Sequence, residues 1–134
     1  LAVTGEASAT TDNANFKVRF TGTPTTSDSS KVTATVTNEL AATISVNGLS
    51  TTGDTVTATY TIENYSTELG ANLVVESITN TNSDYFKVTA SLAKPAIAKQ
   101  ETTTLTVTVE LLKTPIDSQT TSITVPVTAT ATTI

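Results

Sequence analysis

Twelve carboxylates and one cluster of amide and carboxylate oxygens are the side chains of this chain that could do chemistry. Paired carboxylates hydrolyse glycosides when one serves as the acid and the other as base or nucleophile. Here they are spread over turns and solvated strand faces, and no tryptophan offers a platform for a sugar ring. Asn80, Asn82 and Asp84 in NTNSD alternate as Ca²⁺ ligands do, but with one carboxylate they are more typical of a turn.

The absence of histidine and cysteine excludes further kinds of site. Ser-His-Asp and Cys-His nucleophiles cannot be built, and zinc lacks its usual ligands. No glycine-rich phosphate loop is present either. We therefore predict that the chain is not an enzyme, and that it has no catalytic residue, metal, cofactor or small-molecule substrate.

The charge pattern restricts the partners. The net charge is −5, and the seven Lys and Arg residues are scattered, so no basic stripe follows a phosphate backbone. We expect no nucleic-acid partner. No apolar run of about 18 residues occurs, so no membrane span is expected. NYS at 64–66 is the only pattern for N-linked glycosylation.

Period-two alternation of apolar and polar residues runs along most of the chain and predicts strands. Thr fills 34 of the 134 positions, and this β-branched residue suits a sheet with one face in water. The residues expected to point inward are Phe16, Val18, Phe20, Val32, Ala34, Val36, Ala42, Ile44, Val46, Val56, Ala58, Tyr60, Ile62, Phe86, Val88, Ala90, Leu92, Leu105, Val107, Val109, Leu111, Ile123, Val125, Val127, Ala129 and Ala131.

The predicted fold is all-β. Residues 1–134 are expected to form a single domain, a two-sheet β-sandwich of about 8–9 strands, with jelly-roll or immunoglobulin-like topology. Gly53-Asp54 is expected to centre a turn before the clearest strand, at 55–64.

Two segments depart from simple alternation. In 72–79 the apolar residues do not share one face, which a bulge or a strand buried on both faces would explain. Pro126 interrupts the last apolar run, and proline cannot donate to a ladder. We therefore expect 121–133 to be an edge strand, or one whose position 126 points its amide outward. Its inward residues Ile123, Val125 and Val127, with Pro126, form a candidate acceptor edge for another chain.

The opening stretch LAVTGEASA reads as a strand from the first residue. Leu1, Val3, Ala7 and Ala9 fall on one side, with Gly5 as a notch between them. Because the later strands suffice for a sandwich, residues 1–13 are a candidate N-terminal donor strand. The start at Leu1 without methionine favours a mature chain after signal-peptide removal, and so a secreted or cell-surface location.

A resemblance covers about residues 45–112. GLSTTGDTVTATYTIEN (48–64) looks like the pattern GDxVxxxxxIxN of many extracellular β-sandwiches, and IAKQETTTLTVTVEL (97–111) looks like the matching later strand. Together with YFKVTASL, they are similar to the TasA–camelysin group of secreted fibre and biofilm-matrix proteins, and to generic immunoglobulin-like surface modules. The resemblance implies export, a surface or matrix location, and polymerisation by strand donation between subunits.

Two functions follow as alternatives. In the first, the chain is a structural subunit of an extracellular filament, a head-to-tail homopolymer in which residues 1–13 complete a neighbour's sheet. In the second, it is a monomeric binding or spacer module of a secreted or cell-surface protein, with the opening strand folded back on its own sheet.

A rough energy estimate limits the first alternative. Burying Leu1 and Val3 contributes about 2 kcal/mol each, and about eight ladder hydrogen bonds contribute about 1 kcal/mol each. Ordering nine residues costs roughly 1–2 kcal/mol apiece, so the terms nearly cancel. A fibre therefore also requires contact between the sandwich bodies.

Overall fold

The computed structural model describes residues 2–9 and 15–133, and of residues 2–9 it describes the backbone. Within these residues the chain forms eleven strands and no helix. The strands are β1 (Ala2–Ala9), β2 (Val18–Thr26), β3 (Val32–Asn38), β4 (Ala41–Val46), β5 (Thr55–Asn64), β6 (Gly70–Val75), β7 (Thr79–Asn80), β8 (Phe86–Leu92), β9 (Ala96–Ile97), β10 (Thr102–Leu111) and β11 (Ser122–Thr132). Among the residues described, no helix is long and apolar enough to span a membrane.

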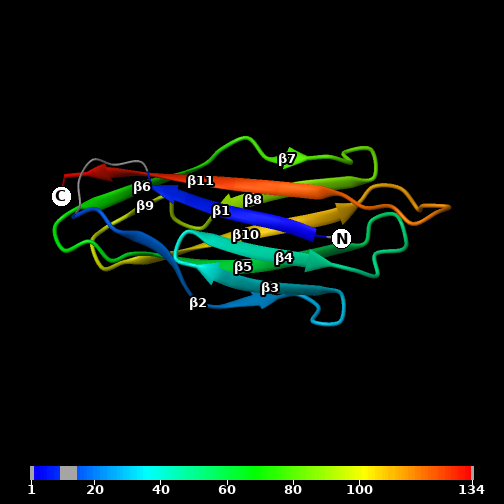
Figure 1. Cartoon of the computed structure of the whole chain (residues 1–134), viewed down its shortest axis with the longest axis horizontal. Helices are drawn as coiled ribbons and strands as arrows, with labels where there is room; N and C mark the ends of the chain where they lie inside the picture. The colour runs from blue at the N-terminus through cyan, green and yellow to red at the C-terminus, as the bar shows by residue number, and fades with distance from the viewer. Residues whose placement is uncertain (1, 10–14, 134) are drawn as a thin grey trace.

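Two sheets pack face to face as an elongated β-sandwich, which confirms the predicted fold class (Figure 1). One sheet has the order β3-β4-β1-β11-β6-β9, with β7 also paired to β11. The other has the order β2-β5-β10-β8. All pairs are antiparallel except β1 with β11, which run parallel.

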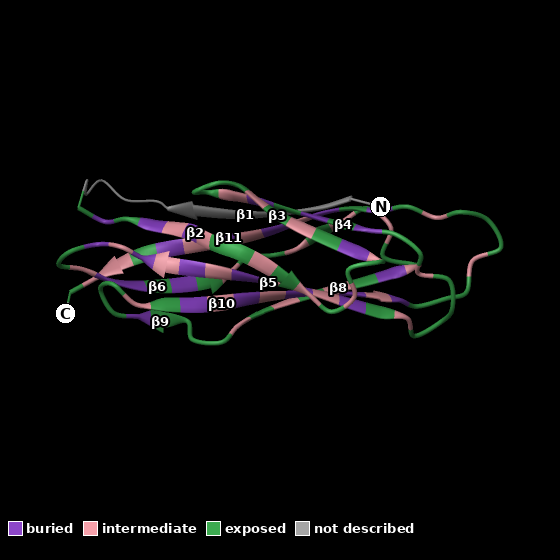
Figure 2. Cartoon of the chain, turned by 90° about the horizontal axis from the view of Figure 1, so that it is seen from below, coloured by how far each residue is buried: buried purple, intermediate pink, exposed green. Residues whose placement is uncertain are grey.

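The core lies between the sheets and follows the alternation of the sequence (Figure 2). Every second residue of β5 and of β10 is buried. The predicted inward positions are buried or partly buried from Phe16 to Ala131. Only two aromatic rings, Phe20 and Tyr60, contact each other, at 5.9 Å between centroids among the described residues. Small aliphatic side chains therefore fill most of the core.

The irregular segment 72–79 is an interrupted strand. β6 ends at Val75 and β7 begins at Thr79, and both pair with β11. Val74 is 51% exposed, so a strand buried on both faces is the wrong one of the two explanations. The break lets the chain change register along β11, as a bulge does.

β11 is an internal strand, so the first of the two alternatives for 121–133, an edge strand, is wrong for this arrangement. β1 lies on one side of it, and β6 and β7 lie on the other. The carbonyl of Pro126 accepts the N–H of Glu76, at 2.9 Å, in the break between β6 and β7. Because the N–H and C=O of a strand residue point to the same side, the missing proline donor also faces this break. An internal strand tolerates Pro126 for that reason.

A tight turn and one side-chain hydrogen bond tie the two sheets together. Gly53 has φ 93°, and the Asp54 carboxylate accepts the N–H groups of Ser50 and Thr51, both at 3.0 Å. These hydrogen bonds lower the pKa of Asp54. The predicted turn is confirmed.

Across the core, the Tyr60 hydroxyl of β5 donates to the Thr43 carbonyl of β4, at 2.9 Å.

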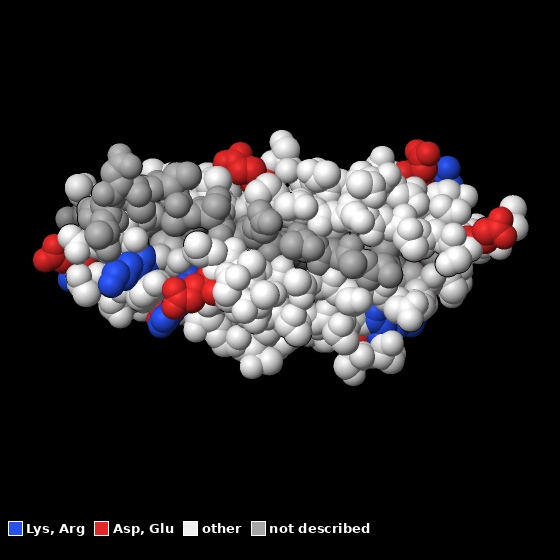
Figure 3. Space-filling view, viewed as in Figure 1, with Lys and Arg blue, Asp and Glu red and all other residues white. Residues whose placement is uncertain are grey.

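Threonine rows cover the outer faces, as their alternation predicts. On the sheet that contains β11, the hydroxyls of Thr35 and Thr43 lie 2.6 Å apart on neighbouring strands. Figure 3 shows few charged side chains on this broad face, mostly toward its ends and rim. Among the described side chains the face is therefore rich in hydroxyls and carries few charges, which keeps a long β surface hydrated.

Candidate subunit interface

The N-terminal strand fills a slot in the middle of the larger sheet. β4 and β11 do not pair with each other, and β1 is the strand that joins them. Without β1 the sheet would consist of two separate parts, β3-β4 on one side and β11 with β6, β7 and β9 on the other. The slot is therefore a site that an extended segment of eight residues completes.

The register places the candidate donor residues opposite the candidate acceptor residues. Val3 pairs with Ile123, Gly5 with Val125, and Ala7 with Val127. On the other side, Val3 pairs with Ile44 and Gly5 with Ala42. Further along, Glu6 pairs with Pro126 and Ala9 with Ala129. Leu1 and residues 10–13 of the predicted donor segment lie outside the described residues.

The slot walls are apolar where they face the core. Ile123, Val125 and Val127 of β11 are at most 3% exposed, as are Ala42 and Ile44 of β4. The odd-numbered residues of β11 are buried and align with the odd-numbered residues of β1. A strand with apolar residues at alternate positions therefore fits this slot.

The strand ends where the body of the sandwich begins. Ala9 pairs with Ala129, near the end of β11, and Val18 at the start of β2 pairs with Asn64. The Asn64 side chain contacts the loop that precedes β6. The first residue of β6, Gly70, pairs with Thr132 of β11. We call this end of the sandwich, with Ala9, Asn64 and Thr132, the linker end. The opposite end holds Ala2 and its partners Ser45 and Ser122.

Asn64 is the buried polar centre of the linker end. It is 0% exposed, and its amide nitrogen donates to the carbonyls of Leu69 at 2.9 Å and Ala98 at 3.2 Å. Its side-chain oxygen accepts the N–H of Ser66 at 3.1 Å, and Gln100 donates its backbone N–H to the Asn64 carbonyl at 2.7 Å. The Asn64 side chain thereby joins the β5–β6 loop to the β9–β10 loop.

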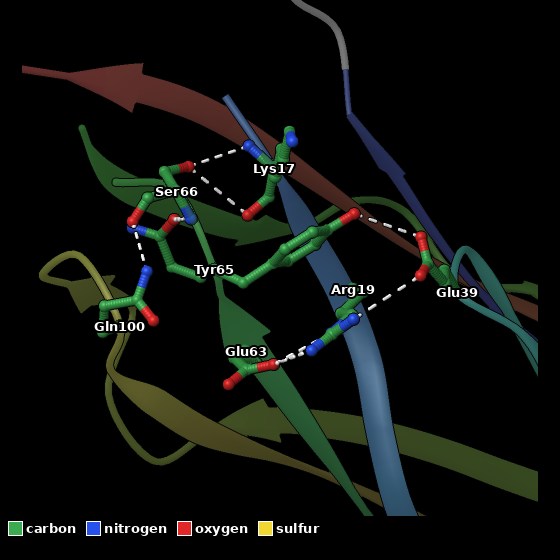
Figure 4. A network of polar contacts seen from close by, with 8 residues as sticks. Lys17, Arg19, Glu39, Glu63, Tyr65, Ser66 and Gln100 are labelled. Atoms are coloured by element: carbon green, nitrogen blue, oxygen red, sulfur yellow. Dashed lines mark hydrogen bonds and ion pairs between the residues drawn. The ribbon is translucent and has the colours of Figure 1, made fainter. Parts of the chain in front are cut away.

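The start of β2 is fastened to the same loop (Figure 4). The Ser66 hydroxyl accepts the N–H of Lys17 at 2.8 Å, and Tyr65 donates its N–H to the Lys17 carbonyl at 2.9 Å. The Gln100 side chain donates to the Ser66 carbonyl at 2.8 Å. The hydrogen bonds of Lys17 to Tyr65 and Ser66 therefore resist a force applied through the residues that precede Lys17.

A charged cluster closes the linker end across the two sheets (Figure 4). Arg19 of β2 contacts Glu63 of β5 at 2.8 Å and Glu39 of the β3–β4 turn at 3.6 Å. Its guanidinium carbon lies 4.2 Å from the centre of the Tyr65 ring, whose hydroxyl donates to Glu39 at 3.1 Å. The hydrogen bond to Glu63 raises the pKa of Arg19.

The alternation of β5 predicts that Asn64 is buried, although this position was not among the residues predicted to point inward. Val56, Ala58, Tyr60 and Ile62 point inward, so the next even position, Asn64, falls on the same buried face. The glycosylation pattern NYS instead suggests an exposed asparagine at this position. Because the Asn64 amide is buried and doubly hydrogen-bonded, it is not accessible to a transferase in the folded chain.

The opposite end presents a fully exposed hydrophobic side chain. Ile116, in the loop from β10 to β11, is 99% exposed. At the linker end, a shallow hollow of about 320 Å³ is lined by small and apolar residues, including Ala71, Ala96 and Ile97. Lys94 and Glu101, joined by a 2.8 Å ion pair, also line it. A protruding Ile116 at one end and a hollow at the other are suited to a head-to-tail contact between two subunits.

The NTNSD segment is a turn, as predicted. The Asn80 amide donates to the Phe86 carbonyl at 2.8 Å, and its side-chain oxygen accepts the Thr121 hydroxyl. The Asn82 amide donates to the Thr120 carbonyl at 2.9 Å. Both side chains are therefore engaged in holding the turn to the loop before β11.

Comparison with protein-family models, curated proteins and solved structures found no match for this chain. The resemblance to secreted fibre proteins thus stays a prediction from the residues quoted for it.

Proposed function

We propose that the chain is a structural subunit of an extracellular filament, in which the N-terminal strand of each subunit completes the slot of a neighbour. The observation that supports this most is the position of β1, an N-terminal strand between β4 and β11, which have no other connection within their sheet. Strand addition uses the same backbone hydrogen bonds whether the strand comes from its own chain or from another. The partner is a second copy, and the location is secreted or cell-surface.

A second candidate function has its own supporting observation. In this structure β1 completes the sheet of its own chain, as expected of a monomeric binding or spacer module. The two candidates differ in how the protein behaves in solution. A module stays monodisperse at 13.8 kDa, whereas a donor-strand subunit forms polymers.

Electron microscopy and size-exclusion chromatography of untagged, natively secreted protein test the proposal. Filaments that dissociate to the 13.8 kDa chain on denaturation are the expected result. A single monomeric species at all concentrations would instead assign the chain to the module class.

Ile116 is expected to supply part of the contact between bodies. Burying an isoleucine contributes about 1.5–3 kcal/mol, so Ile116→Ser should raise the critical concentration for filament growth about tenfold or more. Thermal stability should not change, because the side chain is 99% exposed in the subunit. Pelleting assays across a concentration series measure this effect.

Val74→Ser is the matched control for Ile116→Ser. Val74 is also an exposed aliphatic residue, at 51%, but it lies on the outward face of β6 rather than at an end. Its variant should pellet like the unmodified chain. Equal critical concentrations for Ile116→Ser and the unmodified chain would exclude Ile116 from the interface.

A further inference from the structure

The direction of β1 in the slot conflicts with end-to-end growth. β1 enters at the opposite end, where Ala2 pairs with Ser122, and finishes at the linker end, where Ala9 pairs with Ala129. Its own body resumes at the linker end with Asn15.

We propose that in the filament the donated strand runs through the slot in the direction opposite to β1, antiparallel to β11 and parallel to β4. This inference rests on the proposed strand donation. In an end-to-end stack, the linker end of the donor faces the opposite end of the acceptor. Ser8 of the donor must then enter beside Ser122 of the acceptor, and Ala2 must reach toward Thr128.

Keeping the direction of β1 would give a different assembly. The donor's Ala9 would leave the slot at the acceptor's linker end, and its Asn15 would follow within about 20 Å, the reach of six peptide units. The two linker ends would then face each other, and each slot could take the strand of the other chain. Such a reciprocal exchange closes as a twofold pair and does not extend end to end.

The sequence of β1 fits the slot in both directions. Alternation with period two reads the same forward and backward. With Gly5 kept opposite Val125, reversal places Val3 at Val127 and Ala7 at Ile123, so odd-numbered residues remain at buried positions of β11. On β4, Gly5 stays at Ala42 and Ala7 moves to Ile44, again a buried position.

Reversal also improves the type of pairing. β1 contacts β11 over eight residue pairs and β4 over five. The parallel ladder is slightly less stable per residue than the antiparallel one. Reversal makes the longer contact antiparallel and the shorter one parallel. Pro126 does not obstruct it, because its carbonyl points to Glu76 on the other side of β11.

One donor position with two reporter positions tests the direction, since the chain has no cysteine of its own. Ser8→Cys is combined with Thr128→Cys, its partner in the single chain, or with Ser122→Cys, its partner after reversal. Ser122 and Thr128 lie at outward positions of β11. Filaments are first seen by electron microscopy, then oxidised, and resolved on denaturing gels without reductant.

The expected result is a ladder of covalent multimers from S8C/S122C filaments and none from S8C/T128C filaments. Disulfides between chains in S8C/T128C alone, whether they give dimers or a ladder, would overturn the reversal while leaving strand donation intact. A disulfide within single chains of S8C/T128C filaments, without a ladder in either variant, would overturn donation as well.

A second measurement tests donation separately. Oxidation of monomeric S8C/T128C should lock β1 in its own slot, block filament growth, and be reversed by dithiothreitol. The single-cysteine variants serve as controls and should grow under both conditions. Growth of the locked monomer at the normal rate would show that the strand need not leave, and so would overturn both proposals.

Discussion

Deletion of residues 1–9 is expected to abolish filament growth and to leave a sandwich body of reduced stability. The deletion removes the one strand that lies between β4 and β11 among the described residues, and leaves the ladder groups of both strands unpaired. It also uncovers part of Ile44, Val125 and Val127, which are at most 2% exposed in the complete sheet. Full burial of such a side chain contributes about 1.5–3 kcal/mol. The strand's own side chains and hydrogen bonds nearly cancel against its ordering cost. The uncovered walls are not part of that balance, so a loss of about 3–5 kcal/mol is expected from them.

The loss should appear as a fall in Tm of roughly 10–20 °C for a domain of this size. The body should nonetheless keep its fold, because the second sheet, β2-β5-β10-β8, does not include β1. The Tyr60 hydroxyl also still holds β4 to that sheet through the Thr43 carbonyl. Circular dichroism with thermal melting measures the change.

Adding the missing segment as a peptide separates folding from assembly. The peptide LAVTGEASA should raise the Tm of the deleted chain and suppress aggregation through its open edges, yet restore no filaments, because it carries no body. A control peptide with Val3→Asp and Ala7→Asp should not bind, since it places charges opposite buried residues of β11. Filaments formed by the deleted chain alone would contradict strand donation.

Alternation in the sequence identified the buried face of nearly every strand but not its neighbours. Side chains of one parity point to one face whichever strand lies beside them, so Ile123, Val125 and Val127 were predicted to be inward. Pairing joins residues far apart in the chain, such as Val3 with Ile123. Nothing local to LAVTGEASA indicates a central position in the sheet. The other apolar runs were numerous enough to form a sandwich without it.

Pro126 shows why a sound rule gave the wrong position. Proline is excluded from a ladder only on the side that its nitrogen faces. On that side, β11 meets the break between β6 and β7, where Glu76 donates to the Pro126 carbonyl. The break itself was visible as irregular alternation in 72–79. The break between β6 and β7 leaves room for the proline that has no N–H to donate. The two irregularities are far apart in the sequence, and the pairing of β6 and β7 with β11 brings them together.

Replacement of Asn64 is expected to have the largest effect of any single substitution at the linker end. Its side chain makes three hydrogen bonds at a position with no solvent exposure. Asn64→Ala leaves the carbonyls of Leu69 and Ala98 and the N–H of Ser66 without these partners. Each buried polar group left unsatisfied costs about 1–3 kcal/mol, so a loss of about 3 kcal/mol or more is expected.

The same substitution should weaken filaments beyond its effect on the folded body. Asn64 positions Ser66, which in turn holds Lys17 at the point where the donated segment leaves the sandwich. Filaments of the variant should therefore break at lower shear than those of Asn47→Ala. Asn47 is an exposed asparagine at the opposite end, and its variant should unfold within about 0.5 kcal/mol of the unmodified chain.

Asn64→Asp tests the role of the amide with nearly unchanged shape. Its carboxylate would face the carbonyl oxygens of Leu69 and Ala98, which lie 2.9 Å and 3.2 Å from the present amide nitrogen. Burial and these acceptors disfavour the charged form, so the pKa of the introduced carboxyl should rise above its ordinary value of about 3.9. The folded state then binds more protons than the unfolded state above about pH 4, and stability falls as pH rises.

The difference in Tm between the unmodified chain and Asn64→Asp should accordingly be small near pH 4 and should widen toward pH 7. Using this difference removes the acid response of carboxylates present in both proteins, such as Asp54 and Glu101, whose pKa values are lowered by hydrogen bonds. A difference in Tm that does not depend on pH would show that the amide nitrogen is not the group that holds the two carbonyls.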